Sequence, residues 1–189
     1  SADSRRAHFI LLGRFAISFL PTLTARAVGG IALSSWGNGT KEIIMSSKPG
    51  IVICTRLNSC RVPQKAIVEI CGLPAIRILV ERLLKTGAPE ICVALSDAVK
   101  DAPIRAALKD FEDKIIFFSG HPDNPLARTF WAAEENGYDP VVRITHDDII
   151  QDGELINRMI DFHTREKNDY TYISKIVRGM DCEIVGKAL

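Results

Sequence analysis

The chain has 189 residues, of which 47% are hydrophobic and 25% charged, which is typical of a globular protein with one well-buried core. Its formal net charge of +1 gives no overall field that would attract nucleic acid or an anionic membrane, so we expect neither partner. Local groups of arginine and lysine remain compatible with small polyanionic ligands.

The N-terminal segment, residues 1–49, differs from the rest of the chain. Arginines stand among apolar and small residues up to position 44, where the acidic residues are Asp3 and Glu42. Three interpretations compete: a transit-like leader, the tail of another domain, or residues upstream of the true start, with Met45 as initiator. We favour the last interpretation and expect an atypical extension ahead of the folded domain.

The apolar run from Phe9 to Leu20 is interrupted by Gly13 and Arg14 and is too short for a membrane span. We therefore expect a soluble, cytoplasmic protein without a membrane partner. The cysteines show no CxxC pairs typical of zinc or redox sites, so we expect reduced core residues; they are Cys54, Cys60, Cys71, Cys92 and Cys182.

From Ile51 onward, short apolar runs alternate with longer amphipathic segments, which predicts βαβ units and a mainly parallel sheet. Strands are expected at Ile51–Thr55, Glu90–Leu95, Lys114–Phe118, Pro140–Ile144 and Tyr170–Ser174, with a last one at Cys182–Val185. Helices are expected at Ala75–Lys85, Ala102–Lys109, Leu126–Asn136 and Glu154–Glu166, and Asp101 before Pro103 indicates a helix start. In such sheets ligands bind beyond the carboxyl ends of the strands.

The first polar cluster follows the strand Ile51–Thr55 directly. It contains three cations, Arg56, Arg61 and Lys65, together with Ser59. Forked guanidinium donors, a compact ammonium and backbone N–H groups suit a triphosphate. The glycine patterns of P-loops, kinases and dinucleotide folds do not occur. The alternative is a solvated basic turn after a buried strand.

The second cluster follows the strand Pro140–Ile144. Carboxylates at a strand's carboxyl end that face a triphosphate loop suit Mg²⁺, and Asp147 is the main candidate ligand, ahead of Asp148. Either residue could instead cap the next helix, although Asp152 is better placed to do so. His146 could be a base or a ligand, but we expect it to be exposed.

Four further residues stand at or near strand ends. Asp97 and Arg128 could line a nucleoside, although a helix cap and a solvated helix charge are equally compatible with their positions. Asp181 and Glu183 alternate along a strand, which directs both carboxylates to one side, where they could share a cation or be solvated.

The first cluster resembles the opening of the cytidylyltransferases that make CMP-activated acidic sugars, the acylneuraminate and KDO cytidylyltransferase type. The resemblance is strongest to the spore-coat polysaccharide biosynthesis branch. It rests on Arg56-x-x-Ser59-x-Arg61-x-Pro63-x-Lys65, followed by Gly72-Leu73-Pro74 and Arg82. It continues where the family shows Arg-Ile-Thr-Gly-Asp and a later Asp-Pro, at Arg143-Ile144-Thr145-x-Asp147 and Asp152. The departures from that pattern are His146, Asp148-Ile149 and Gly153.

The resemblance implies a three-layer Rossmann-like fold of the nucleotide-diphospho-sugar transferase type over residues 50–189. Because family members continue further, we expect the chain to be C-terminally incomplete, and the family implies a homodimer. The implied activity is Mg²⁺-dependent transfer of a cytidylyl group from CTP to a sugar acceptor, with release of pyrophosphate, in surface polysaccharide or nucleotide-sugar biosynthesis.

The resemblance also implies residue roles. The catalytic residues would be Arg56, Lys65 and Asp147, and the metal ligands Asp147 and Asp181. The nucleotide-binding residues would be Arg56, Ser59, Arg61, Lys65, Asp97 and Arg128. Two alternatives remain open, a glycosyltransferase that uses a nucleotide-diphosphate sugar and a non-catalytic nucleotide-binding homologue.

Overall fold

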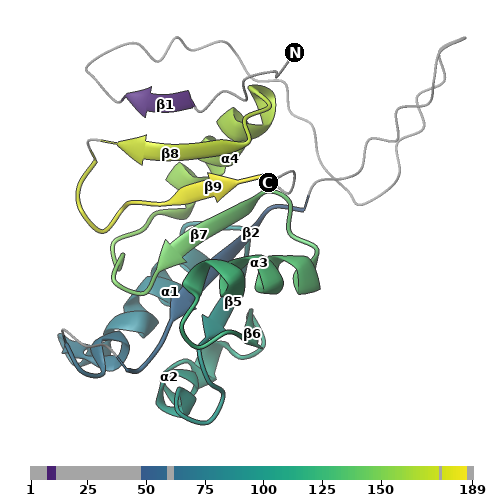
Figure 1. Ribbon diagram of the computed structural model, residues 1–189. Helices are drawn as coiled ribbons and strands as arrows, with labels where there is room; N and C mark the ends of the chain where they lie inside the picture. Colours follow the sequence, from purple (N-terminus) through teal and green to yellow (C-terminus); the bar gives the residue numbers. More distant parts are fainter. Residues whose placement is uncertain (1–7, 12–47, 59–61, 175, 187–189) are drawn as a thin grey trace, which may run out of the picture. The chain divides into compact units, whose positions relative to one another are not determined.

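The computed structural model describes residues 8–11, 48–58, 62–174 and 176–186 of the chain. Its main sheet has the strand order β1-β8-β9-β7-β2-β5-β6 (Figure 1). Neighbours among β7, β2, β5 and β6 pair in parallel, whereas β9 is antiparallel to both β7 and β8. The bounds are β1 His8–Leu11, β2 Gly50–Thr55, β5 Glu90–Leu95, β6 Ile115–Ser119, β7 Val141–Thr145, β8 Tyr170–Ser174 and β9 Glu183–Val185.

Helices cover both faces of this sheet, because both faces of the inner strand β2 are apolar. Ile51 and Ile53 join a buried cluster with residues of α1 (Ala75–Lys85), α2 (Ala102–Ala107) and α4 (Gly153–Arg165). Val52 and Cys54 point the other way, into a cluster with α3 (Pro125–Asn136). A strand that is buried on both faces is typical of a parallel sheet between helical layers. The predicted three-layer α/β fold is therefore confirmed.

The strands and helices predicted between residues 51 and 185 are all present, with bounds that agree within two residues. The sequence analysis did not predict β1, which pairs in parallel with β8. It also did not predict the hairpin of β3 (Glu69–Ile70) and β4 (Leu73–Pro74), or the short 3-10 helices η1 (Lys65–Ile67) and η2 (Lys109–Phe111). Most of the N-terminal extension lies outside the described residues, so its interpretation stays a prediction.

The cysteine prediction is correct for three positions and wrong for one. Cys54, Cys92 and Cys182 are buried and unpaired, whereas Cys71 is exposed because it lies in the turn between β3 and β4. Cys60 lies outside the described residues. Burial raises the pKa of the Cys92 and Cys182 thiols to about 12, so both stay protonated at neutral pH.

No helix in the described part of the chain combines the length and apolar character that crossing a bilayer requires.

Candidate nucleotide-binding site

A cavity of about 260 Å³ opens where the carboxyl ends of β2 and β7 adjoin the first turns of α3. Four cationic side chains and one carboxylate line it, which gives it a net positive charge suited to a polyanion. The lining residues are Cys54, Thr55, Arg56, Lys65, Pro125, Arg128, Arg143, Thr145, His146 and Asp147.

Lys65 and Asp147 are in direct contact within this cavity. Lys65 is the first residue of η1 and Asp147 follows β7, and the Lys65 Nζ donates a hydrogen bond to Asp147 Oδ2. The two side chains remain 32% and 37% exposed, so a ligand entering the cavity can reach both. The fold thus brings the predicted triphosphate lysine and the predicted metal ligand together.

Of the other residues predicted for the triphosphate loop, Arg56 is the one that the structure describes. It lines the cavity immediately after β2. Ser59 and Arg61 lie outside the described residues, so their phosphate-binding roles stay predictions.

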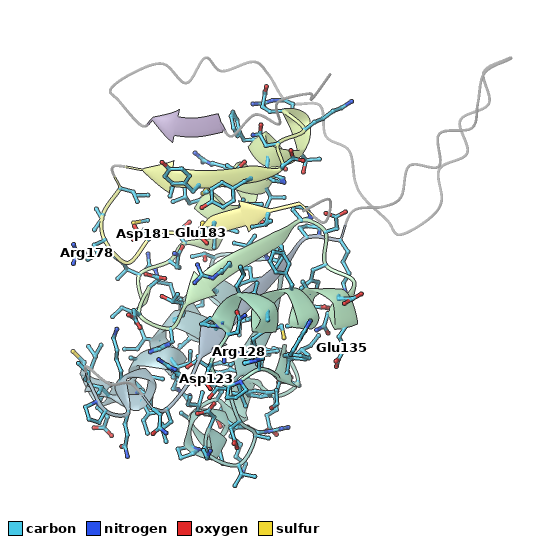
Figure 2. The ribbon with its side chains drawn as sticks, in the orientation of Figure 1. Asp123, Arg128, Glu135, Arg178, Asp181 and Glu183 are labelled. Carbon is cyan, nitrogen blue, oxygen red and sulfur yellow. The ribbon has the colours of Figure 1, made fainter. Side chains whose placement is uncertain are left out.

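Arg128 is a buried arginine in the first part of α3, and Figure 2 labels its position. Only 2% of the residue is exposed, and its Nη1 donates to the carbonyl oxygen of His121 at 2.8 Å. Its Nε is buried without a hydrogen-bond partner. The alternative interpretation of a solvated helix charge is therefore wrong. A buried guanidinium with an unused donor lines the cavity, which is consistent with a ligand-binding role.

Asp97 makes a local turn after β5. Its Oδ1 accepts hydrogen bonds from the backbone N–H groups of Lys100 and Val99, both at 2.9 Å. These bonds hold the pKa of Asp97 below its ordinary value. The residue does not line either of the two cavities described in this subsection. Its role in nucleotide binding stays a prediction, and because α2 begins only at Ala102, the contacts present are those of a turn and not of a helix cap.

His146 is largely buried, contrary to the expectation of an exposed side chain. Only 13% of the side chain is exposed, and its Nδ1 lies 3.4 Å from the backbone oxygen of Cys54 on β2. Burial lowers the pKa of His146, so the ring is neutral at pH 7. Next to it, Asp148 closes the turn after β7, where its Oδ2 accepts from the N–H and hydroxyl of Thr145.

The remainder of the loop between β7 and α4 is also held by hydrogen bonds. Arg82 on α1 donates from Nε to the backbone oxygen of Gln151 at 2.7 Å. The buried amide of Gln151 donates to the backbone oxygen of Asp181. Asp152 caps α4 by accepting from the N–H of Leu155 at 3.0 Å, which confirms the predicted cap.

A second cavity, of about 350 Å³, adjoins the first and shares Arg143 and Thr145 with it. Asp181 and Glu183 both line it, at the start of β9 in Figure 2, in agreement with the prediction that they face one side. Arg143 bridges to Glu183 through a hydrogen bond of 2.7 Å. The other lining residues are Asp148, Tyr172, Ile173 and Cys182, and burial raises the pKa of Asp148.

The predicted metal ligands do not line a common cavity, because Asp147 faces the first and Asp181 the second. In the described residues, no group of three or more histidine, cysteine or acidic side chains is arranged to hold a metal ion. Mg²⁺ usually takes only one or two protein carboxylates when substrate phosphates supply further oxygens. Asp147 beside a cationic cavity fits an ion that arrives with a triphosphate.

Asp101 is a buried residue whose importance the sequence analysis missed. It was noted only as a helix start, yet its side chain forms no capping bond to α2. Its carboxylate instead accepts hydrogen bonds from Leu57, after β2, and from Ser96 and Asp97, after β5. Asp101 does not stand directly after a predicted strand, so the sequence contains little that would indicate these long-range contacts.

A mainly parallel three-layer α/β fold with a cationic cavity at the carboxyl edge of its sheet is typical of nucleotide-binding domains. The model of the cytidylyltransferase family matches residues 51–187, and the chain therefore belongs to the cytidylyltransferase family.

Two curated relatives agree with this assignment. The chain is 32% identical over 89 residues to a 3-deoxy-manno-octulosonate cytidylyltransferase of Coxiella burnetii, which covers 47% of this chain and 34% of the relative. It is 27% identical over 143 residues to the spore coat polysaccharide biosynthesis protein SpsF of Bacillus subtilis, covering 73% and 59%. The chain thus spans between about a third and three fifths of the length of these relatives.

Solved structures share the fold. A cytidylyltransferase from Leptospira borgpetersenii superposes with a TM-score of 0.68 at 24% identity, over 74% of this chain and 60% of the other. A CMP:2-keto-3-deoxy-manno-octonic acid synthetase complexed with CTP gives a TM-score of 0.55 at 22% identity, over 64% and 49%. Both likenesses concern the fold alone.

Proposed function

We propose that this domain transfers a cytidylyl group from CTP to a sugar hydroxyl, with release of pyrophosphate, in the synthesis of a nucleotide sugar for a surface polysaccharide. The observation that carries the proposal is the contact between Lys65 and Asp147 in a cavity that Arg56 also lines. Cationic side chains bind a triphosphate, and a carboxylate binds the metal ion. Transfer of a nucleotidyl group requires the cations and the metal ion next to the same phosphate. Membership of the cytidylyltransferase family supports the choice of CTP.

The reaction forms a bond between the sugar oxygen and the α-phosphorus, breaks the bond from that phosphorus to the leaving pyrophosphate, and releases the hydroxyl proton to solvent. Arg56 and Lys65 line the cavity and would hold the phosphate oxygens, which spreads the negative charge that grows on the leaving group. Arg128 also lines the cavity and would add positive charge beside the nucleotide. Positioning and charge stabilisation account for most of the rate in such transfers, and no covalent enzyme intermediate is required.

Mg²⁺ would be held by Asp147 together with phosphate oxygens, and when bound it supplies positive charge at the transferred phosphate. Lys65 contacts Asp147 in this structure, and we expect its ammonium to exchange that carboxylate for a phosphate oxygen when a triphosphate binds. Both side chains are about a third exposed, and an exposed pair of this kind opens at a cost of about 1 kcal/mol or less.

The sugar would occupy the second cavity, which adjoins the first at Arg143 and Thr145. Its carboxylates accept hydrogen bonds and are therefore suited to sugar hydroxyl groups. Asp181 lines this cavity and is retained as a proposed second metal ligand.

A thermal-shift titration with CTP, ATP, GTP and UTP, each with and without Mg²⁺, tests the proposal because ligand binding raises the apparent stability of the folded state. We expect the largest rise with CTP and a further rise with Mg²⁺, and Arg56→Ala should abolish most of both. Release of pyrophosphate from CTP and a sugar supports the transferase. A nucleotide response without CTP preference, or turnover that releases free nucleoside diphosphate instead, would contradict the proposal.

A further inference from the structure

Asp101 is a buried carboxylate that joins two loops at the ligand-binding edge of the sheet. Only 1% of the residue is exposed. Oδ1 accepts from the N–H of Leu57 at 2.7 Å, while Oδ2 accepts from the N–H of Ser96 at 2.8 Å, from its hydroxyl at 2.7 Å and from the N–H of Asp97 at 3.1 Å. The donors are uncharged and come from the segments after β2 and after β5. A buried carboxylate with this many donors is firmly held.

The bond to Leu57 matters because Leu57 closes the cationic loop. Its N–H is held by Asp101, and its carbonyl oxygen accepts from the N–H of Gln64 at 3.2 Å. Arg56 precedes Leu57 and Lys65 follows Gln64, so both cationic residues flank this closure and both line the first cavity. Asp101 thereby fixes the point at which the loop leaves and rejoins the body of the domain.

We propose that Asp101 is the positioning residue of the phosphate-binding loop, an inference that rests on the proposed function. It lines neither cavity and acts through Leu57 and Gln64 on the directions of Arg56 and Lys65. Without the hydrogen bond from Leu57 to Asp101, which we call the clamp, Arg56 and Lys65 would have to be ordered when the triphosphate binds, and that loss of conformational freedom weakens binding. Loss of the clamp should therefore weaken binding of the triphosphate portion of CTP more than binding of the nucleoside portion.

The variant Asp101→Asn tests this role, because it keeps the size of the side chain but replaces one accepting oxygen with a donating amide. The two loops present only donors to Asp101, so the asparagine cannot satisfy both. Calorimetric titration with CTP, inorganic tripolyphosphate and CMP should show the first two binding about tenfold more weakly, with CMP changed by less than about threefold. Asp110→Asn, at an exposed carboxylate that pairs with Arg77, serves as the matched control and should bind all three like the wild type.

The outcomes separate the two proposals. A wild-type chain that binds neither CTP nor tripolyphosphate overturns the proposed function and this inference together. If the wild type binds CTP and Arg56→Ala weakens binding while Asp101→Asn does not, only the positioning role is overturned. A uniform loss for CTP, tripolyphosphate and CMP also overturns it, because a general structural defect shows no preference for the longer phosphate chain.

Amide hydrogen exchange provides a second test. It uses only the wild-type chain, so its result does not depend on whether a variant folds. The clamp requires the amides of Leu57 and Gln64 to exchange slowly before any nucleotide is added, since both are hydrogen-bonded in this structure. Exchange of the Leu57 amide at the rate of an unstructured peptide would overturn the inference.

Discussion

Replacement of Asp147 by asparagine should separate CTP binding from metal-dependent turnover. The change keeps the shape of the side chain but removes its charge and therefore the ionic partner of Lys65. In the absence of metal, the wild-type carboxylate both holds Lys65 and repels the incoming triphosphate. The variant should therefore bind metal-free CTP more tightly than the wild type, although it loses a group proposed to be catalytic.

The size of this effect follows from the exposure of the pair. With side chains 32% and 37% exposed, the contact between Lys65 and Asp147 contributes about 0.5–1 kcal/mol, because solvent screens it. The repulsion between the Asp147 carboxylate and a nearby phosphate is of similar size, about 1 kcal/mol in a well-solvated site. Together they predict metal-free binding that is tighter by about 1.5–2 kcal/mol, or about twelve- to thirtyfold.

Mg²⁺ should affect CTP binding differently in the two proteins. It should strengthen CTP binding to the wild type but not to Asp147→Asn, and pyrophosphate release should fall by about two to three orders of magnitude in the variant. Calorimetry with a chelator and with Mg²⁺, together with a pyrophosphate assay, measures both quantities. Asp161→Asn, at an exposed carboxylate on α4, is the control. An unchanged Mg²⁺ response in Asp147→Asn, or weaker metal-free binding, would refute the reasoning.

Three further predictions concern stability. Burial lowers the pKa of His163 from 6.5, so the unfolded chain takes up its proton first and the free energy of unfolding should decrease as the pH falls below about 6.5. Urea denaturation at about pH 7.5 and about pH 5.5 should show a smaller decrease for His163→Gln, and a flat wild-type profile would contradict this. Gly50→Ala should lower the free energy of unfolding by about 2–3 kcal/mol, because the new Cβ would overlap with the Tyr138 ring. An unchanged melting temperature would count against that packing. Asp152→Ala should cost about 1 kcal/mol by removing the cap on Leu155, whereas Asp152→Asn should melt near the wild type; equal losses in both would show that capping is not the cause.

The elements of the fold were largely predictable because their signals are local. The apolar runs of β5 and the amphipathic pattern of α1 gave bounds that match the structure at both ends. Residues typical of turns and helix starts limited where the other helices and strands could begin and end. The parallel pairing of β1 with β8 was not predictable. The paired positions, such as His8 and Thr171, lie far apart in the chain, and no local pattern in β1 specifies its partner.

The site was predictable as a list of chemical groups rather than as an arrangement. Arg56, Lys65 and Asp147 were selected because cations and a carboxylate followed predicted strands. Their meeting in one cavity required β2 and β7 to be neighbours, which depends on the strand order. The burial of Arg128 and His146 was not visible in the sequence, where each stands in a polar or mixed segment and burial depends on residues far along the chain.

The sequence by itself determined the α/β class, the positions of the predicted strands and helices, and the residue types available at the carboxyl edge of the sheet, because hydrophobic periodicity and turn chemistry act over a few residues. Only the tertiary structure decided which groups face one another. Lys65 meets Asp147 across 82 positions, and Leu57 meets Asp101 across 44. Contacts at such separations form only when the whole sheet packs between its helices, so their geometry belongs to the assembled core and to no single segment of the chain.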